Sequence, residues 1–293
     1  MKMRSVIKKP RLKNLGFTLI ELMTVISIIG LLSTIVMAAV FQARDKARIG
    51  AGQQFGANLL HTLYAVALYE FDEGSGTVVQ DSTGSKLNGT INGSVSYTTQ
   101  TPNGRGYALD FSGAANSYVQ LPAKIVANAT NFTFAWVYWR GNSPSGGIYW
   151  QRIFDFGSGI NVYMFLTPDS QSNTLRFAIT TSGNGNEQQI NAPSTLPIGI
   201  WEYVAVTIDN TKKLGVMYLN GVEIGRNNNM TISPASLDTV NGGTTSNYIG
   251  KSQWGDPYFN GIIDSVHIFS DNLSVSEIQK IYAEEKALHL AMH

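Results

Sequence analysis

The chain has 293 residues, with 21 Lys or Arg against 20 Asp or Glu and no Cys. The absence of Cys excludes disulfide bonds and thiol chemistry. Six of the basic residues, and no acidic one, lie within residues 1–16, so the rest of the chain has 15 basic and 20 acidic residues. Such a mildly acidic body argues against nucleic-acid binding, which requires a basic surface.

Residues 17–43 form an apolar run in which Glu21 is the only charged residue. A run of this length can span a bilayer as a helix, and the basic residues before it place the N-terminus on the cytoplasmic side. A carboxylate inside such a run costs about 2.5–3.5 kcal/mol on insertion scales. We therefore expect Glu21 to have a cationic partner.

The basic segment, Gly16, Phe17, the residues Thr-Leu-Ile, Glu21 and the apolar run resemble the N-terminus of a type IV prepilin or pseudopilin. The resemblance implies that residues 1–16 are a leader, which a prepilin peptidase removes after Gly16, and that the new N-terminus at Phe17 is methylated. It also implies that Glu21 pairs with the α-amino group of Phe17 in a neighbouring pilin or pseudopilin subunit. A plain signal anchor with an incidental Glu21 is the alternative. An ordinary secretory signal is excluded, because its cleavage follows the apolar core.

Residues 17–65 are predicted to form one transmembrane and assembly helix, because they lack Pro and, apart from Glu21, carry charge only after the apolar run. The charged residues 44–48 mark the expected exit from the membrane. Gly50, Gly52 and Gly56 each weaken a helix by about 1 kcal/mol relative to Ala. The sequence therefore predicts a bend or a flexible zone around these glycines.

From about residue 66 the pattern changes to short β-rich segments separated by Gly, Asn, Ser and Pro, which is typical of an all-β sandwich or barrel. These segments are residues 131–139, 174–180, 203–209, 215–219, 222–224 and 262–269. Asn220-Gly221 predicts a two-residue hairpin turn, since both positions of that turn need positive φ.

A short helix is predicted at the end of the chain. Ser274 and Glu277 have the spacing of a capping box, in which each residue bonds the backbone N–H of the other. Ile278, Ile281 and Tyr282 follow as an apolar stripe that can pack on the sandwich.

Residues 66–282 resemble a laminin-G-like or concanavalin A-like jelly roll. The matching segments include LYEFDEGSG at residues 68–76, YALDF at 107–111, MYLNG at 217–221 and FNGIIDSVHIF at 259–269. With the first resemblance, this implies an α+β protein. A long N-terminal pilin-type α-helix precedes an all-β jelly-roll sandwich with a short C-terminal helix at residues 66–285, and residues 286–293 form a tail.

The jelly-roll resemblance also implies a structural calcium ion, and Asp81, Asn88 and Asp264 are its predicted ligands. Calcium takes six to eight oxygen ligands, usually with carboxylates among them. Asp81 and Asn88 flank a loop, and Asp264 lies in the last strand, which neighbours the first in this fold. In the alternative, Asp81 and Asn88 are turn residues that bond their own backbone, and Asp264 caps a neighbouring loop.

Aromatic residues in or beside loops are the predicted ligand-binding residues, because exposed aromatic faces stack on sugars and anchor protein contacts. They are Trp139, Tyr149, Trp150, Trp254 and Tyr258. The preferred pair is Trp254 and Tyr258, with Asp256 and Asn260 as hydrogen-bonding partners. The alternative places these aromatic residues in the core, as we expect for Trp136 and Trp201.

Catalytic residues are not predicted. Retaining glycosidases need two carboxyl groups about 5–5.5 Å apart, and jelly-roll glucanases supply them from Glu-x-Asp-x-Glu. Glu70 and Asp72 have this spacing, but Gly74 stands where the second Glu is required. A Gly-x-Ser-x-Gly elbow and a metal-type His cluster are also absent from the sequence.

The sequence thus predicts a non-enzymatic subunit of a type IV filament, in a minor or tip position, whose head binds a glycan or a protein adhesively. A type II secretion pseudopilin is the alternative, and a membrane-anchored jelly-roll glycoside hydrolase is a weaker one. Expected partners are other pilin or pseudopilin subunits, the prepilin peptidase and the membrane, but no nucleic acid. The chain is expected in the bacterial inner membrane before assembly, and in an extracellular or periplasmic filament afterwards.

Overall fold

The computed structural model describes residues 18–129, 134–271 and 273–290. The chain divides into two compact units, residues 1–58 and 59–293. The first holds most of helix α1 (Leu19–Tyr64), which we call the stem. The second holds the β-strands and the remaining helices, and we call residues 65–290 the head. Residues 1–16, which are predicted to be a leader, and Phe17 lie outside the described residues.

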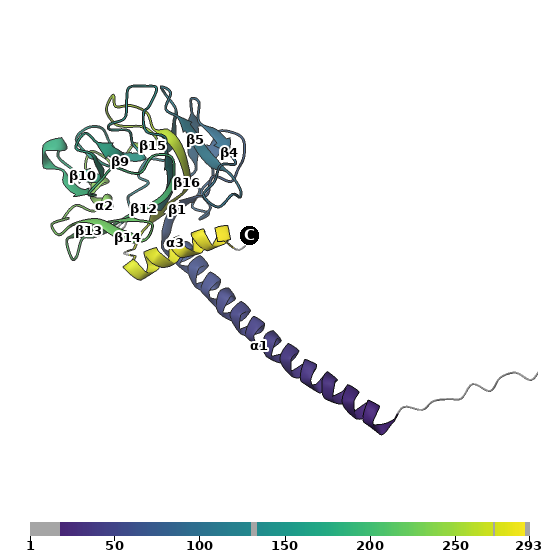
Figure 1. Ribbon diagram of the computed structural model, residues 1–293. Coiled ribbons are helices and arrows are strands. Elements are labelled where there is room, and N and C mark those ends of the chain that lie inside the picture. Colours follow the sequence, from purple (N-terminus) through teal and green to yellow (C-terminus); the bar gives the residue numbers. More distant parts are fainter. Residues whose placement is uncertain (1–17, 130–133, 272, 291–293) are drawn as a thin grey trace, which may run out of the picture. The chain divides into compact units, whose positions relative to one another are not determined.

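The stem is assigned as one uninterrupted α-helix, and it continues through Gly50, Gly52 and Gly56, where the sequence predicted a bend or a flexible zone (Figure 1). Its segment Leu19–Phe41 has a mean hydropathy of 2.4 and none of it is buried. By length and composition, this segment can cross a membrane.

The head consists of two eight-stranded sheets, which we call sheets A and B (Figure 1). Sheet A contains β1 (Ala65–Tyr69), β4 (Ser96–Thr98), β5 (Ala108–Ser112), β7 (Phe134–Trp139), β12 (Trp201–Asp209), β13 (Leu214–Leu219), β14 (Val222–Asn227) and β16 (Asn260–Phe269). Sheet B contains β2 (Val78–Val79), β3 (Gly89–Asn92), β6 (Tyr118–Leu121), β8 (Phe154–Gly157), β9 (Tyr163–Ser170), β10 (Thr174–Thr180), β11 (Gln188–Asn191) and β15 (Ser246–Ile249). The helical segments of the head are η1 (Asn184–Asn186), α2 (Pro234–Leu237) and α3 (Val275–Leu290).

Strand pairing brings the two ends of the head together. Sheet A has the order β14-β13-β12-β7-β16-β5-β4, and β1 also pairs with β16. Sheet B has the order β11-β10-β9-β8-β15-β6-β3-β2. The first strand therefore lies against the last, with Leu68 opposite His267, as the jelly-roll resemblance implied.

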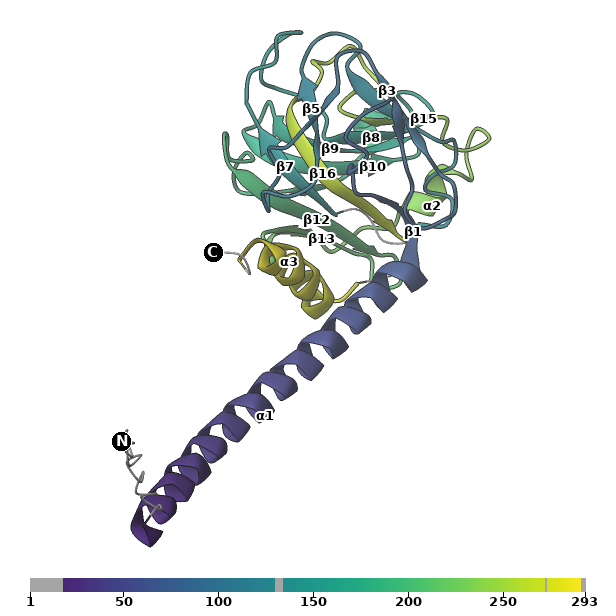
Figure 2. The same cartoon turned by 90° about the vertical axis from the view of Figure 1, so that its right-hand side faces the viewer.

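Alternation along β12 shows how sheet A buries both of its faces. Val204, Val206 and Ile208 point into the main core between the sheets. Tyr203 and Ala205 point to the other face, where they join a second cluster with Ile278 and Ile281 of α3. Helix α3 lies along the outer face of sheet A, next to β12 and β13 (Figure 2). The apolar stripe predicted for this helix is therefore confirmed.

Two local predictions are also confirmed. Asn220 and Gly221 connect β13 to β14 with φ angles of 52° and 76°, the positive values that the two-residue hairpin turn needs. At the start of α3, the Ser274 N–H donates to Glu277 Oε2 at 2.7 Å, and the Glu277 N–H donates to Ser274 Oγ at 3.3 Å. This is the reciprocal capping box that the spacing predicted.

Candidate functional site

The start of the stem is the first candidate site, and the structure gives Glu21 a partner within its own chain. Both the backbone N–H and the hydroxyl of Thr18 donate to Glu21 Oε2, each at 2.8 Å. The Glu21 N–H donates in return to Thr18 Oγ1 at 3.3 Å. Thr18 and Glu21 therefore form a capping box that closes the N-terminus of α1.

Sequence analysis missed the role of Thr18, although the signal was present. Thr18-x-x-Glu21 has the same spacing as Ser274-x-x-Glu277. For Glu21, only the free-energy cost of placing its carboxylate in the bilayer was considered. Gly16 and Phe17, predicted for cleavage and methylation, lie outside the described residues. The pairing of Glu21 with a neighbouring Phe17 therefore stays a prediction.

The predicted calcium residues are engaged in hydrogen bonds. Asp81 Oδ1 accepts from the N–H groups of Leu68 and Thr83 at 3.2 and 3.0 Å, and Asp81 Oδ2 accepts from the Leu87 N–H at 3.2 Å. The Thr83 hydroxyl lies within 2.9 Å of both carboxylate oxygens. The Asn88 side-chain oxygen accepts from the Asp81 N–H at 3.0 Å.

These hydrogen bonds surround the Asp81 carboxylate with donors, whereas calcium requires further oxygen ligands. Asp264 is buried on β16 opposite Trp136. In the part of the chain that the structure describes, no group of three or more acidic, His or Cys side chains could hold a metal ion. The hydrogen bonds at Asp81 and Asn88 are those expected of the alternative in which both residues organise a turn. Calcium binding by Asp81, Asn88 and Asp264 stays a prediction.

The preferred ligand residues at 254–260 lie together, but their polar groups are occupied. Trp254 is half-buried and packs edge-on against Tyr163, with ring centroids 4.6 Å apart. Asp256 Oδ2 accepts from Arg152 Nη2 at 3.0 Å. Asn260 Nδ2 donates to the Asn142 carbonyl at 2.7 Å. The ligand role of Trp254, Tyr258, Asp256 and Asn260 therefore stays a prediction.

Arg152 is the centre of a buried charged cluster that holds this loop on sheet B. Its guanidinium lies 4.1 Å from the Phe165 ring centroid, 3.4 Å from Asp155 Oδ2 and 3.0 Å from Asp256. Burial raises the pKa of Asp155 to about 7 and outweighs the opposing effect of Arg152. Hydrogen bonds from Gln253 also lower this pKa, and the nearby charge of Asp256 raises it by a smaller amount than burial does.

The two carboxylates weighed for glycoside hydrolysis have separate structural contacts. Glu70 Oε1 lies 3.5 Å from His267 Nε2, and Asp72 Oδ1 accepts from the Tyr107 N–H at 2.8 Å. Both residues follow the end of β1 rather than lying within a strand. This arrangement gives no support to the pairing that a retaining glycosidase needs.

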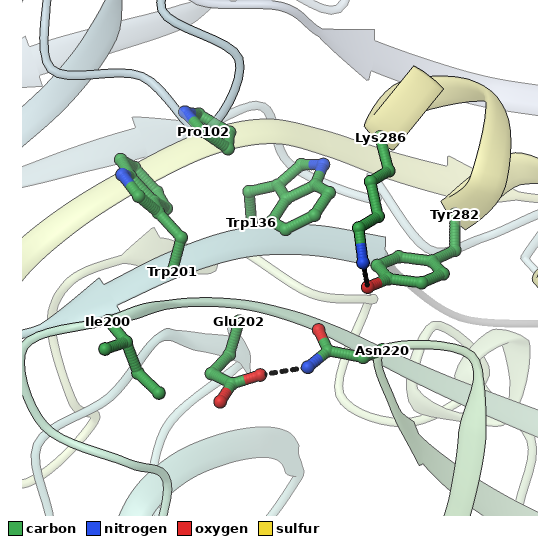
Figure 3. Close-up of a pocket in the computed structure, with 8 residues that line it drawn as sticks. All are labelled: Pro102, Trp136, Ile200, Trp201, Glu202, Asn220, Tyr282 and Lys286. Atoms are coloured by element: carbon green, nitrogen blue, oxygen red, sulfur yellow. Dashed lines mark hydrogen bonds between the residues drawn. The ribbon is translucent and has the colours of Figure 1, made fainter. Parts of the chain in front are cut away.

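The second candidate site is a pocket of about 310 Å³ between sheet A and α3 (Figure 3). Its lining residues are Pro102, Trp136, Ile200, Trp201, Glu202, Asn220, Tyr282 and Lys286. Figure 3 shows Trp136 between Trp201 and Tyr282, with Glu202 beside Asn220. Trp201 and Glu202 are the first two residues of β12, so they project to opposite sides of the strand where it begins.

Hydrogen bonds fix the polar residues of the pocket. The Asn220 side-chain amide donates to Glu202 Oε2, and its oxygen accepts from the Tyr203 N–H at 3.0 Å. Glu202 is 5% exposed, and burial raises its pKa more than the Asn220 hydrogen bond lowers it. Lys286 Nζ donates to the Tyr282 hydroxyl at 3.1 Å.

The tryptophan assignments from sequence need correction. Trp139 is 0% exposed and belongs to the main core, so its prediction as a ligand residue was wrong. Trp136 is buried, but on the outer face of sheet A beneath α3. Trp201 is half-buried, packs against the second cluster and also lines the pocket, so its assignment to the core holds only in part.

Family comparisons agree with this architecture. The model of the concanavalin A-like lectin/glucanases superfamily matches residues 112–279, which is more than half of the chain. The model of the prokaryotic N-terminal methylation motif matches residues 11–37. A search of curated proteins finds no match.

Several solved structures share the fold of the head. Domain 4 of AbnA, an extracellular GH43 arabinanase from Geobacillus stearothermophilus solved with arabinotriose, is 24% identical with a TM-score of 0.58, over 74% of this chain and 98% of that one. The binding domain of botulinum neurotoxin serotype G is 14% identical with a TM-score of 0.56, over 76% of this chain and 51% of that one. A Trypanosoma rangeli sialidase is 15% identical with a TM-score of 0.52, over 76% and 33%. Because the identities are low, these likenesses concern the fold alone.

Proposed function

This chain belongs to the concanavalin A-like lectin/glucanases superfamily and carries a prokaryotic N-terminal methylation motif, and we propose that it is a subunit of a type IV filament. In this proposal the stem anchors the precursor in the inner membrane, and it packs among other subunits after a prepilin peptidase removes residues 1–16. The head is a non-enzymatic binding module, carried at a minor or tip position and presented outside the cell.

The observation that carries this proposal is the exposed apolar surface of the stem directly after the methylation motif. Apolar side chains from Leu19 to Phe41 are 45–78% exposed. Contiguous exposed apolar surface of this extent needs a covering of lipid or protein. A helix that first lies in lipid and then packs against copies of itself meets that need at both stages.

Glu21 provides the experiment, because its charge and its capping role can be separated. Glu21→Gln keeps a side-chain oxygen for Thr18, since Gln also serves in capping boxes, but it removes the charge. Thr18→Val keeps the charge and removes the capping hydroxyl. We expect Glu21→Gln and Glu21→Val to insert in the membrane but to reach sheared surface filaments at least about tenfold less than the wild type, because a buried partner charge is left unpaired.

Thr18→Val is expected to assemble within about twofold of the wild type, because a lost cap costs only about 1 kcal/mol. Immunoblots of the sheared surface fraction and of the membrane fraction give the two quantities. Normal incorporation of Glu21→Gln would contradict the charge pairing. Absence of the wild-type chain from surface filaments, with retention in a periplasmic secretion complex, would favour the pseudopilin instead.

A further inference from the structure

Three buried side-chain oxygens near the start of β15 have no hydrogen-bond partner among the residues that the structure describes. They are Asp238 Oδ2, Thr244 Oγ1 and Asn247 Oδ1, and Thr244 and Asn247 are both 0% exposed. We propose that these oxygens bind a monovalent metal cation such as sodium, which joins the loop after α2 to sheet B. A cation at this place would stabilise the head whether or not the chain assembles into filaments.

Hydrogen bonds to the backbone of Thr244 bring the three side chains together. The Thr244 N–H donates to the other oxygen of the Asp238 carboxylate, Oδ1. Asn247 Nδ2 donates to the Thr244 carbonyl at 3.4 Å and to the Pro122 carbonyl at 2.7 Å. These two bonds fix the Asn247 amide with its nitrogen toward the carbonyls, so its oxygen is the atom that is left without a partner.

The loop between α2 and β15 is held close to this place by the fold. The Lys124 N–H donates to the Thr244 carbonyl at 2.7 Å, which ties the loop to the segment after β6. Gly243 has a φ of +97°, and a Cβ atom built there would lie 2.7 Å from Asp238 Oδ1. The Asp238 carboxylate therefore lies against the backbone of its own loop, in a position that a side chain at residue 243 would disturb.

The three oxygens need an occupant, because a buried polar atom without a partner has lost the water that it would otherwise bond. Asn247 Oδ1 is an acceptor only, and so is Asp238 Oδ2 when the carboxylate is ionised, so neither can donate a proton to the other. The Thr244 hydroxyl has one proton to donate. An occupant that attracts all three oxygens at once would remove this cost.

The charge of Asp238 favours a cation over a water molecule. A buried water molecule could donate hydrogen bonds to the two acceptor oxygens, but it would add no positive charge. Within the described part of the chain, Asp238 forms no ion pair, not even with Lys124, whose side-chain carbons pass beside Gly243. Buried charges are usually paired or bound to a metal ion, so a cation is the occupant that this carboxylate requires.

The number of charges favours a monovalent ion. Carboxylate, amide and hydroxyl oxygens suit hard cations. One carboxylate balances one positive charge, whereas a divalent ion would leave a net charge at a buried place, which costs free energy. Calcium also takes six to eight oxygen ligands. This place is distinct from the predicted calcium ligands Asp81, Asn88 and Asp264, because it shares no residue with them.

Thermal denaturation of the full chain in a non-ionic detergent tests for this ion, with tryptophan fluorescence as the signal from the head. Sodium chloride is compared with tetramethylammonium chloride at equal ionic strength, so that screening of surface charges is the same. An ion that binds only the folded state stabilises it. For a head of this size we expect the melting midpoint to be roughly 2–4 °C higher in sodium. Broadening of the sodium NMR signal by the wild-type chain measures binding directly.

Two site variants and two controls locate the ion. Asp238→Asn removes the charge but keeps an oxygen for the Thr244 N–H, and Thr244→Val replaces the hydroxyl by a methyl group. Both should lose the sodium response. Thr239→Val removes an exposed hydroxyl of the same loop and should keep the response. Lys124→Gln should also keep it, because it removes only a competing positive charge. Midpoints in tetramethylammonium chloride show whether each variant is folded.

Three results would overturn the inference. The first is an equal midpoint in the two salts without broadening of the sodium signal, which a buried water molecule would give. The second is a sodium response that survives both site variants. The third is a response to calcium but not to sodium that depends on Asp238, which would make the occupant divalent. A midpoint that rises with sodium or potassium, and only while Asp238 and Thr244 are present, is the result that we expect.

Discussion

The stem and the head use the same apolar residue types for opposite purposes. In the stem, side chains such as Leu19 and Ile20 are 78% and 73% exposed. In the head, Phe154, Phe156 and Phe177 are at most 2% exposed. Burial of apolar surface is the main favourable term in folding. The head therefore carries its own stabilisation, whereas the stem obtains most of its own from lipid or from other subunits.

The first turns of α1 and α3 allow a second comparison of the stem with the head, because each begins with a capping box. Thr18 with Glu21, and Ser274 with Glu277, share the same reciprocal hydrogen bonds. Helix α3 then buries its apolar stripe against sheet A, whereas the apolar segment of α1 is unburied. The same capping box therefore begins α3, which is part of the folded head, and α1, whose apolar segment is exposed.

The largest expected difference between the stem and the head is the loss of head stability when one apolar side chain of each is replaced by Ala. Phe156→Ala should lower the free energy of unfolding of the head by about 3–5 kcal/mol, because it removes a fully buried ring and leaves a cavity. Leu31→Ala should leave the head unchanged, since Leu31 is 65% exposed. Tryptophan fluorescence during denaturation measures the head selectively, because the five Trp residues all lie beyond residue 135. An equal loss in both variants would contradict the independence of the head.

Asp155 should give the head a distinctive pH dependence. Its pKa is raised to about 7 in the folded state, against about 3.9 in an unfolded chain. Between these values the folded state holds the extra proton, so its stability should fall as pH rises from about 4 to 7, by at most about 1.4 kcal/mol per pH unit. Asp155→Asn should remove this part of the slope in denaturation series at several pH values.

Asp209→Asn is the control for the Asp155→Asn series, because the pKa of Asp209 is lowered in the folded state whereas that of Asp155 is raised. Hydrogen bonds from Lys212 lower the pKa of Asp209, so its contribution is present above the ordinary Asp pKa and is lost as pH falls below it. Asp209→Asn should therefore leave the slope between pH 4 and 7 unaltered. An Asp155→Asn slope equal to that of the wild type would show that burial does not raise this pKa.

Removal of the α3 capping box should have a smaller effect. Ser274→Ala should destabilise the head by about 1 kcal/mol, the usual cost of a lost N-cap. Ser276→Ala, in the first turn of the same helix, is the comparison: it removes a hydroxyl that lies 2.9 Å from Ser274 Oγ but leaves the hydrogen bonds between Ser274 and Glu277 in place. Equal destabilisation by both would argue against a capping role.

The smallest expected effect is that of calcium on the melting midpoint of the head. The Asp81 carboxylate is surrounded by N–H and hydroxyl donors, so chelator and millimolar calcium should give the same melting midpoint. Asp81→Ala should destabilise the head with or without calcium, because it leaves several backbone N–H groups unpaired. A midpoint that rises with calcium, and bound metal in elemental analysis, would instead support the predicted site at Asp81, Asn88 and Asp264.

Patterns local in sequence predicted most of the fold. The Asn220-Gly221 turn, the Ser274 cap and the α3 stripe each depend on residues within one or two turns of chain. Two sequence resemblances predicted the pilin-type stem and the jelly roll, and family models now match both.

The pocket could not be predicted in the same way. It joins residues from 102 to 286 across strands, a turn and a helix. Alternation does place Trp136 and Trp139, three residues apart on β7, on opposite faces of the sheet. It does not say which face meets the core, and the assignment of Trp139 to ligand binding was wrong for that reason.

The central claim is that the apolar stem stays in the mature subunit and begins at a processed N-terminus. Mass spectrometry of the chain recovered from sheared surface filaments tests this claim most directly. We predict a chain that lacks residues 1–16 and begins with N-methylated Phe17. A chain that begins at Met1, or one cut after the apolar segment, would contradict the account, because neither could be a processed subunit held in a filament by its stem.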